Sequence, residues 1–217
     1  MPSLRRWICS ALVAAALSAC AERDPGVVVP VTQIHVAGAA TFTTDRGYEV
    51  TLTRAAITVR TVQITGCAAP GAHSTAVLDF LDAPATLDLL APPGEEPIGE
   101  LPARDVAHCG VSVFLAAGDA EPTLVLEGTV SPPGGTPRAL SLTTRATATA
   151  EFTVAAFVPA DGAPRPALRL VHGAVAGWLD GIDLDGASPD EAAAAALAHA
   201  RATLRAALVV DSARRNR

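Results

Sequence analysis

Four side chains with metal-binding chemistry lie in two short stretches of the sequence. Cys67 and His73 share a loop of small residues, and His108 and Cys109 are neighbours in a later segment. Thiolate and imidazole ligands together favour copper or zinc. Their spacing matches no standard metal motif, and two adjacent strand residues point to opposite faces of a sheet. We therefore expect a plain disulfide between Cys67 and Cys109. A metal site at His73 and His108, with or without the cysteines, is the alternative.

A second group of candidate ligands lies near the C-terminus, where five carboxylates fall within a short glycine-containing stretch. They are Asp180, Asp183, Asp185, Asp190 and Glu191. Calcium prefers oxygen ligands of this kind. An EF-hand does not fit, because alignment on Asp185 and Gly186 leaves its first and last ligand positions without an acid. We expect an acidic turn that leads into a helix.

No pairing of a nucleophile with a base is visible among the remaining residues. The sequence lacks the Gly-x-Ser-x-Gly and His-Glu-x-x-His motifs, a phosphate loop and a nucleotide fingerprint. His172 follows Leu168 and Leu170 at two-residue spacing, which predicts a structural histidine in the core. Trp178 is expected to cap one end of the fold. An enzyme of unknown type is thus the least supported class, and we expect neither a catalytic residue nor a cofactor.

The N-terminus carries an export signal. Arg5 and Arg6 precede an apolar run over 7–17, which is too short to span a bilayer because a helix needs ~20 apolar residues. The run ends in Leu17-Ser18-Ala19-Cys20, which resembles the lipobox of bacterial lipoproteins. The resemblance implies that residues 1–19 are removed and that Cys20 is acylated. The acylated Cys20 would then anchor the chain to a membrane.

The same resemblance implies a location. In such lipoproteins an Asp directly after the cysteine commonly retains the protein in the inner membrane, whereas Ala21 follows here. We therefore expect a lipid anchor in the outer membrane, with the domain facing the periplasm or the exterior. Residues 20–30 are expected to form a short tether, which keeps the domain close to the membrane.

Cysteine usage fits an exported protein. Cys9 lies in the segment that is removed and Cys20 is acylated, which leaves Cys67 and Cys109 as a pair. In an oxidising compartment such a pair most simply forms one disulfide. Closing this loop would stabilise the fold by about 4 kcal/mol on the chain-entropy model.

The charge of the chain argues against two kinds of partner. All 16 basic residues are arginines, and the net charge of −6 becomes −8 once Arg5 and Arg6 are removed. An acidic domain with scattered arginines argues against nucleic-acid binding and against a polybasic lipid-binding surface.

Residues 31–185 show a succession of β-strand patterns separated by Gly, Pro and Asp clusters. The apolar alternation over 48–65 changes phase near Ala55-Ala56 and again near Thr61, which predicts two bulges or turns. Alternation over 140–158 is too long for one ordinary strand, so we expect a bend near Thr144-Arg145 and a passage from one sheet to the other. The alternation over 109–115 predicts Cys109 inside and His108 outside.

The period changes after residue 185. Ser188 as N-cap, Pro189 at the first position and the acids that follow predict a helix over 189–209. The expected fold is an all-β, antiparallel β-sandwich of about eight or nine strands with one C-terminal helix. Its expected domains are a signal peptide (1–19), a tether (20–30), the sandwich (31–185), the helix packed on it (186–210) and a frayed tail (211–217). The expected function is a non-catalytic binding or interaction module of the bacterial envelope.

Overall fold

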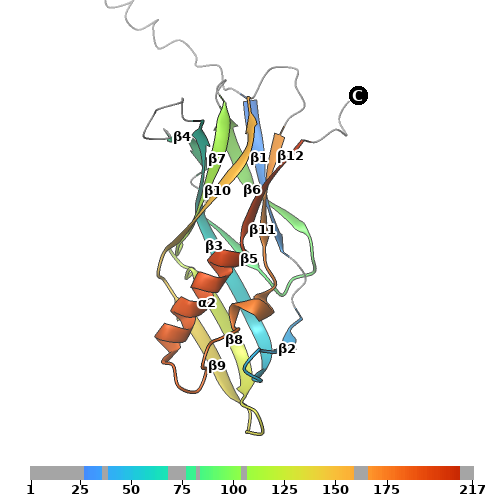
Figure 1. Cartoon of the computed structure of the whole chain (residues 1–217), viewed down its shortest axis with the longest axis vertical. Coiled ribbons are helices and arrows are strands. Elements are labelled where there is room, and N and C mark those ends of the chain that lie inside the picture. Colours follow the sequence, from blue (N-terminus) through green and yellow to red (C-terminus); the bar gives the residue numbers. More distant parts are fainter. Residues whose placement is uncertain are drawn as a thin grey trace, which may run out of the picture.

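The computed structural model describes residues 27–35, 39–67, 77–81, 84–103, 107–158 and 166–210. The described part is an elongated molecule of two β-sheets and one α-helix (Figure 1). It confirms an all-β, sandwich-like fold with a C-terminal helix. Within the described residues it contains twelve strands rather than the eight or nine expected, because several short edge strands lack a clear sequence pattern.

One sheet has four strands in the order β12-β11-β1-β6. Their bounds are Arg205–Val210 for β12, Pro166–His172 for β11, Val27–His35 for β1 and Glu95–Ala103 for β6. β1 and β11 run parallel, while the other neighbours are antiparallel, so this sheet is mixed. Because β1 begins at Val27, residues 27–30 belong to the sheet and not to the predicted tether, whose other residues lie outside the described part of the chain.

The second sheet has eight strands, and five of them follow the order β10-β7-β3-β8-β9. The short strands β2, β4 and β5 pair along the other edge of β3. The bounds are Thr41–Thr43 (β2), Glu49–Gly66 (β3), Val77–Leu81 (β4), Ala85–Asp88 (β5), His108–Leu115 (β7), Leu124–Ser131 (β8), Arg138–Thr144 (β9) and Ala148–Phe157 (β10).

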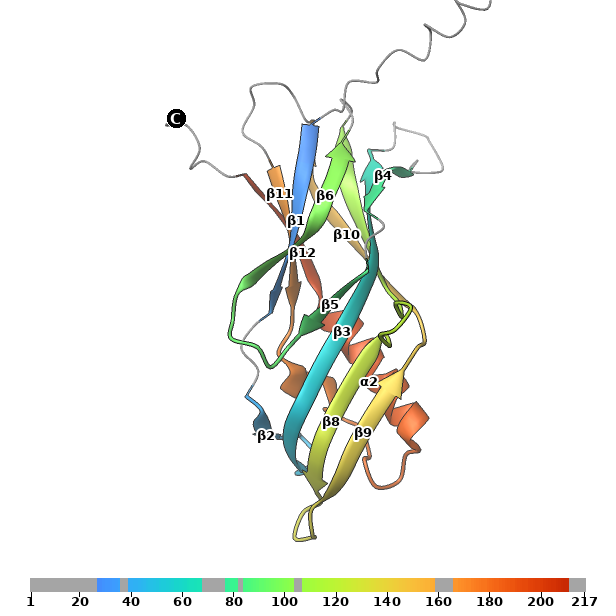
Figure 2. The same cartoon turned by 180° about the vertical axis from the view of Figure 1, so that it is seen from behind.

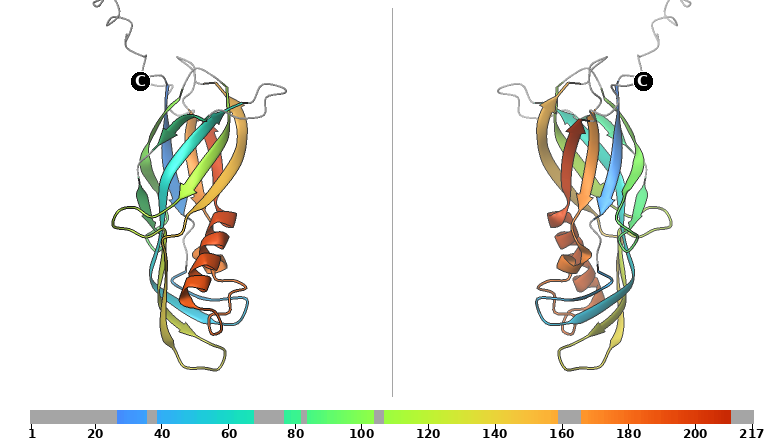
Figure 3. Two further views of the ribbon diagram at one scale, coloured as in Figure 1. Left: turned by 90° about the vertical axis from the view of Figure 1, so that its left-hand side faces the viewer. Right: turned by 90° about the vertical axis from the view of Figure 1, so that its right-hand side faces the viewer.

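β3 runs through most of the length of the molecule (Figure 2). Its 18 residues extend roughly 60 Å at ~3.3 Å per residue. Its first half pairs with β8, and its second half pairs with β7 on the same edge. The molecule therefore has a sandwich half, in which the two sheets face each other, and a helix half, in which the helix α2 (Pro189–Thr203) covers the sheet (Figure 3).

The two phase changes predicted in this strand are bulges. The pairing register of β3 shifts between Leu52 and Arg54 against β8, and again between Val59 and Thr61 against β7. Each extra residue turns the following side chains over, so Val50, Ile57 and Val62 all point to the core although their parity differs. Opposite the first bulge the backbones approach so closely that a Cβ on Gly128 would overlap the carbonyl oxygen of Thr51.

The long alternation after residue 138 is also broken where predicted. β9 ends at Thr144 and β10 begins at Ala148. The predicted passage to the other sheet is wrong, because β9 pairs with β8 and β10 pairs with β7 within the same sheet. The bend is needed because β8 and β7 themselves lie end to end along β3.

The helix α2 spans Pro189–Thr203, and a short 3-10 helix, η1, spans Val175–Trp178. Ser188 is the N-cap of α2, as predicted, and together with Glu191 it forms a capping box. The predicted end at residue 209 is wrong, because Leu204 is extended and 205–210 forms β12. The alanines and leucine at 206–208 fit both the helix period and the strand period. Pairing with β11 makes this segment a strand.

Candidate functional site

The two cysteines in the described part of the chain are joined. Cys67 and Cys109 form a disulfide with their Cα atoms 5.2 Å apart, and the Cys67 amide donates to the carbonyl oxygen of Ala107 at 2.8 Å. The bond links the end of β3 to the start of β7. The disulfide expected from the cysteine count is confirmed.

His108 lies in the core, contrary to the predicted outward position. Its side chain is 0% exposed and its ring stacks on Phe157, with the centroids 5.1 Å apart. The cause is a bulge in β7: Thr65 pairs with Gly110 and Gly66 with His108, so Cys109 is an extra residue. Because of this bulge His108 points inward, although the alternation further along the strand would place it outside.

The predicted pair of metal ligands is therefore not seen together. His73 lies outside the described residues, and His108 points into the core. Among the described residues, no group of three or more His, Cys, Asp or Glu side chains is arranged to hold a metal ion.

The predicted core position of His172 is confirmed, and Trp178 is buried rather than exposed. His172 is fully buried, with its Nε2 atom 2.9 Å from Oε1 of Gln33, which is also fully buried. Trp178 is fully buried as well, and its Nε1 donates to Thr203 Oγ1 at 3.1 Å. The inward position of Gln33 could not be seen in the sequence, because its apolar neighbour Ile34 is the more obvious core residue. These side chains are part of the buried interior.

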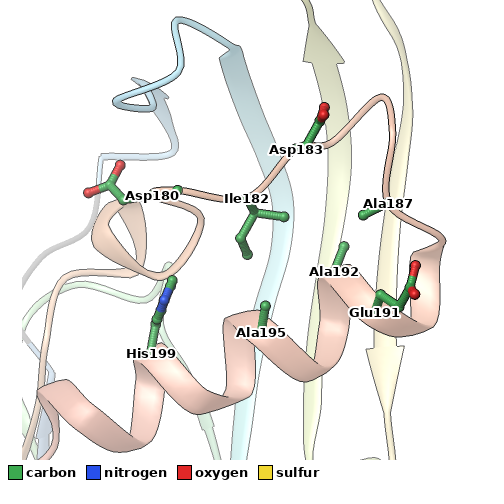
Figure 4. A pocket seen from close by; sticks show the side chains of 9 residues that line it. Asp180, Ile182, Asp183, Ala187, Glu191, Ala192, Ala195 and His199 are labelled. Atoms are coloured by element: carbon green, nitrogen blue, oxygen red, sulfur yellow. The ribbon is translucent and has the colours of Figure 1, made fainter.

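The hollow that the described residues do form lies between α2 and the loop that precedes it (Figure 4). Its volume is about 370 Å³. The lining consists of small apolar residues, three carboxylates and one histidine. These residues are Asp180, Gly181, Ile182, Asp183, Ala187, Glu191, Ala192, Ala195 and His199. This groove contains three of the five acids that the sequence singled out.

Asp183 stabilises the conformation of the loop that precedes α2. Its Oδ1 atom accepts hydrogen bonds from the Tyr48 hydroxyl at 2.9 Å and from the amides of Asp185 and Gly186 at 3.2 and 3.1 Å. The hydrogen bond from Tyr48 is the main reason that the pKa of Asp183 lies below its ordinary value, and the two amides add to the effect. Burial, followed by the bond to Asp183, raises the pKa of Tyr48.

Further bonds attach the loop to the turn before β3 and to β9. The amide of Gly181 donates to Asp45 Oδ1 at 2.7 Å, and the amide of Asp45 donates to Asp180 Oδ1 at 3.1 Å. Arg138 donates to the Leu184 carbonyl and to Asp185 Oδ1, the latter at 2.8 Å. Hydrogen bonds thus join segments that lie more than 130 residues apart in the sequence.

The other two polar residues of the groove are also fixed in place. Glu191 accepts from the amide and hydroxyl of Ser188 at 2.9 and 2.8 Å, and these bonds lower its pKa. His199 Nδ1 lies 3.0 Å from the carbonyl oxygen of Trp178. Because a carbonyl only accepts, Nδ1 must carry the hydrogen, which leaves Nε2 as an acceptor in the neutral ring.

The groove therefore presents hydrogen-bond acceptors on a floor of small apolar side chains. Its lining contains no serine, cysteine or lysine that could act as a nucleophile. The prediction of an acidic turn leading into a helix is confirmed by the capping box and by the bonds to Asp183. Such a surface offers acceptor atoms to hydrogen-bond donors.

Comparison with known proteins finds no matching family model, no matching curated protein and no matching solved structure. In the described part of the chain, no helix combines the length and the apolar character needed to cross a membrane.

The bond between Tyr48 and Asp183 predicts a pH-dependent effect of Tyr48→Phe. Because the pKa of Asp183 is lowered in the folded state, its contribution to stability is present above the ordinary carboxyl pKa of about 4 and is lost as the pH falls through the folded value. Urea unfolding should show that Tyr48→Phe destabilises the protein most at pH 7 and less below pH 4.

The control for this experiment is Asp183→Asn, which keeps an oxygen acceptor for Tyr48 but cannot titrate. In that background, the effect of Tyr48→Phe should vary less with pH. An effect of equal size at pH 7 and pH 3 in the parent chain would contradict the assignment.

Proposed function

We propose that this chain is a lipid-anchored protein of the bacterial envelope, held by Cys20 in the outer membrane, and that it works as a non-catalytic binding or interaction module. The disulfide between Cys67 and Cys109 carries the proposal on the structural side. Disulfides persist in oxidising compartments and are rare in the cytosol. The lipobox stretch 17–20 supports export and anchorage by independent means.

The position of the first strand agrees with a short anchor. Only six residues separate Cys20 from Val27, where β1 begins. A fully extended chain covers at most about 24 Å over that distance. The sandwich half would thus lie close to the bilayer, and the helix half would lie away from it.

The groove beside α2 supports binding rather than catalysis. Each of its carboxylates uses an oxygen in a bond that holds the loop or the helix start in place, as Asp183 and Glu191 show. Polar groups fixed in this way form a rigid surface, and a rigid surface loses little entropy on binding.

The anchor is tested by Cys20→Ser in cells of the native host. Without an acyl chain the domain should fold but should no longer be held by lipid, so the protein should extract from the membrane fraction with carbonate or high salt. Fractionation followed by immunoblotting measures the distribution.

Cys9→Ser is the matched control, because Cys9 precedes the expected cleavage site and its replacement should leave the protein with the outer membrane. Complete retention of Cys20→Ser in washed outer membranes would contradict the anchor.

The binding role is tested by filling the groove. Ala195 lines it, whereas Ala194 lies exposed on the neighbouring position of α2 outside the lining. In cross-linking pull-downs from the native envelope, Ala195→Trp should reduce the captured partner at least tenfold while Ala194→Trp captures as much as the parent.

Thermal unfolding of both tryptophan variants checks that the fold is intact. Equal capture by the two variants would exclude the groove as the contact surface. Turnover of an envelope substrate by the purified domain would contradict the non-catalytic role.

A further inference from the structure

The groove beside α2 has polar side chains at both of its ends. Figure 4 shows Asp180 and His199 toward one end, and Asp183 and Glu191 toward the other. At each end one residue belongs to the loop and the other to α2. Glu191 and His199 lie eight residues apart on the helix, which separates their Cα atoms by about 12 Å at 1.5 Å per residue. The two ends are therefore too far apart to hold one small ion between them.

The lining between these ends is apolar. Ile182 of the loop and Ala192 of α2 are only 6% and 3% exposed, and Ala195 lies beside them on the helix. None of these side chains can form a hydrogen bond. A polar group placed against them would lose its bonds to water without replacement, which costs free energy. A ligand that follows the groove from end to end thus needs an apolar segment in its middle.

The polar ends offer acceptor atoms. The carboxylates accept hydrogen bonds, and Nε2 of the neutral His199 ring accepts as well because Nδ1 carries the hydrogen. In the part of the chain that the structure describes, Asp180 and Glu191 form no ion pair. The ion pair of Asp183 with Arg46 is 3.7 Å long and about half exposed, so it is weak. Each end of the groove therefore favours a positively charged donor.

We propose that the groove binds a free aliphatic diamine, with one ammonium group at each polar end and the carbon chain along the apolar middle. This inference rests on the binding role proposed for the groove and names the class of its ligand. An ammonium group has three donors and no acceptor, which matches ends that accept. The loop and the helix start are already held by their own hydrogen bonds, so binding orders few additional groups.

Titration calorimetry on the whole lipidated protein in a non-ionic detergent tests this fit. Diaminooctane has nine bonds of about 1.5 Å between its amines and can reach both ends, whereas diaminopropane has four and cannot. We expect diaminooctane to bind about tenfold more tightly, because the shorter diamine loses one charged hydrogen-bonded contact. Octanedioate, which has a similar chain with a carboxylate at each end, should not bind.

Two substitutions each remove one contact with the ligand. Glu191→Gln removes the charge but keeps the capping box, which accepts either residue at this position. His199→Asn keeps a donor for the Trp178 carbonyl, but its shorter side chain does not reach the position of Nε2. Each variant should bind diaminooctane about tenfold more weakly than the parent.

Asp190→Asn is the matched control. Asp190 is exposed, precedes Glu191 in the first turn of α2 and lies outside the groove lining, so this variant has the same change of net charge. Its affinity for diaminooctane should stay within about threefold of the parent, as expected for an exposed charge that does not contact the ligand. Thermal unfolding checks that each variant is folded.

Three results would overturn the inference: no binding of diaminooctane, equal affinity for the two diamines, or an equal loss of affinity in Asp190→Asn and Glu191→Gln. None of them decides the binding role proposed for the groove, because that role is measured by the capture of an envelope partner with Ala195→Trp. Failure of the ligand class and failure of the binding role are therefore distinguished.

Discussion

The structure depends on one long strand, β3, which has different pairing partners in the two halves of the molecule. β3 pairs with β8 in the helix half and with β7 in the sandwich half, and apolar side chains along it reach the core in both. A regular strand of this length would accumulate twist and lose its inward face. The bulges at Leu52–Arg54 and Val59–Thr61 restore that face twice, and the bend between β9 and β10 follows because their partners lie end to end along β3.

In the helix half, helices take the place of the second sheet. There α2 and η1 cover the inner face, with Trp178 and Leu197 among the buried side chains. The loop between the two helices has no strand to pair with, so its backbone is satisfied by side chains, above all by Asp183. The groove is a consequence of this construction. It lies where a hydrogen-bonded loop, rather than a strand, meets the helix, and its acids are fixed before any ligand arrives.

Much of this fold could be predicted from local patterns. The phase changes in β3, the break near Arg145, the capping box at Ser188 and the pairing of the two cysteines all have short-range or compositional causes. The features that the sequence does not predict depend on contacts between residues that are far apart in the chain. The sequence predicts helix at β12 because residues 206–208 fit both periods, and it predicts an outward His108 because nothing in the sequence marks the bulge at Cys109. The groove itself required the contacts of Tyr48 and Asp45 with a loop more than 130 residues away. Its acids could be recognised in advance, but their partners could not.

If Cys20 is acylated as proposed, the elongated domain is expected to stand on the membrane with its sandwich half near the bilayer and its groove away from it. The most direct measurement is energy transfer from a dye in the domain to an acceptor in the lipid, with the acylated protein in vesicles. A dye on Thr136→Cys, in the exposed turn between β8 and β9, reports the far end, and a dye on Pro102→Cys, which pairs with Val28, reports the near end. With β3 roughly 60 Å long, we expect strong transfer from position 102 and little or none from position 136. Equal transfer from both positions would mean that the domain lies flat on the membrane, and it would contradict this account.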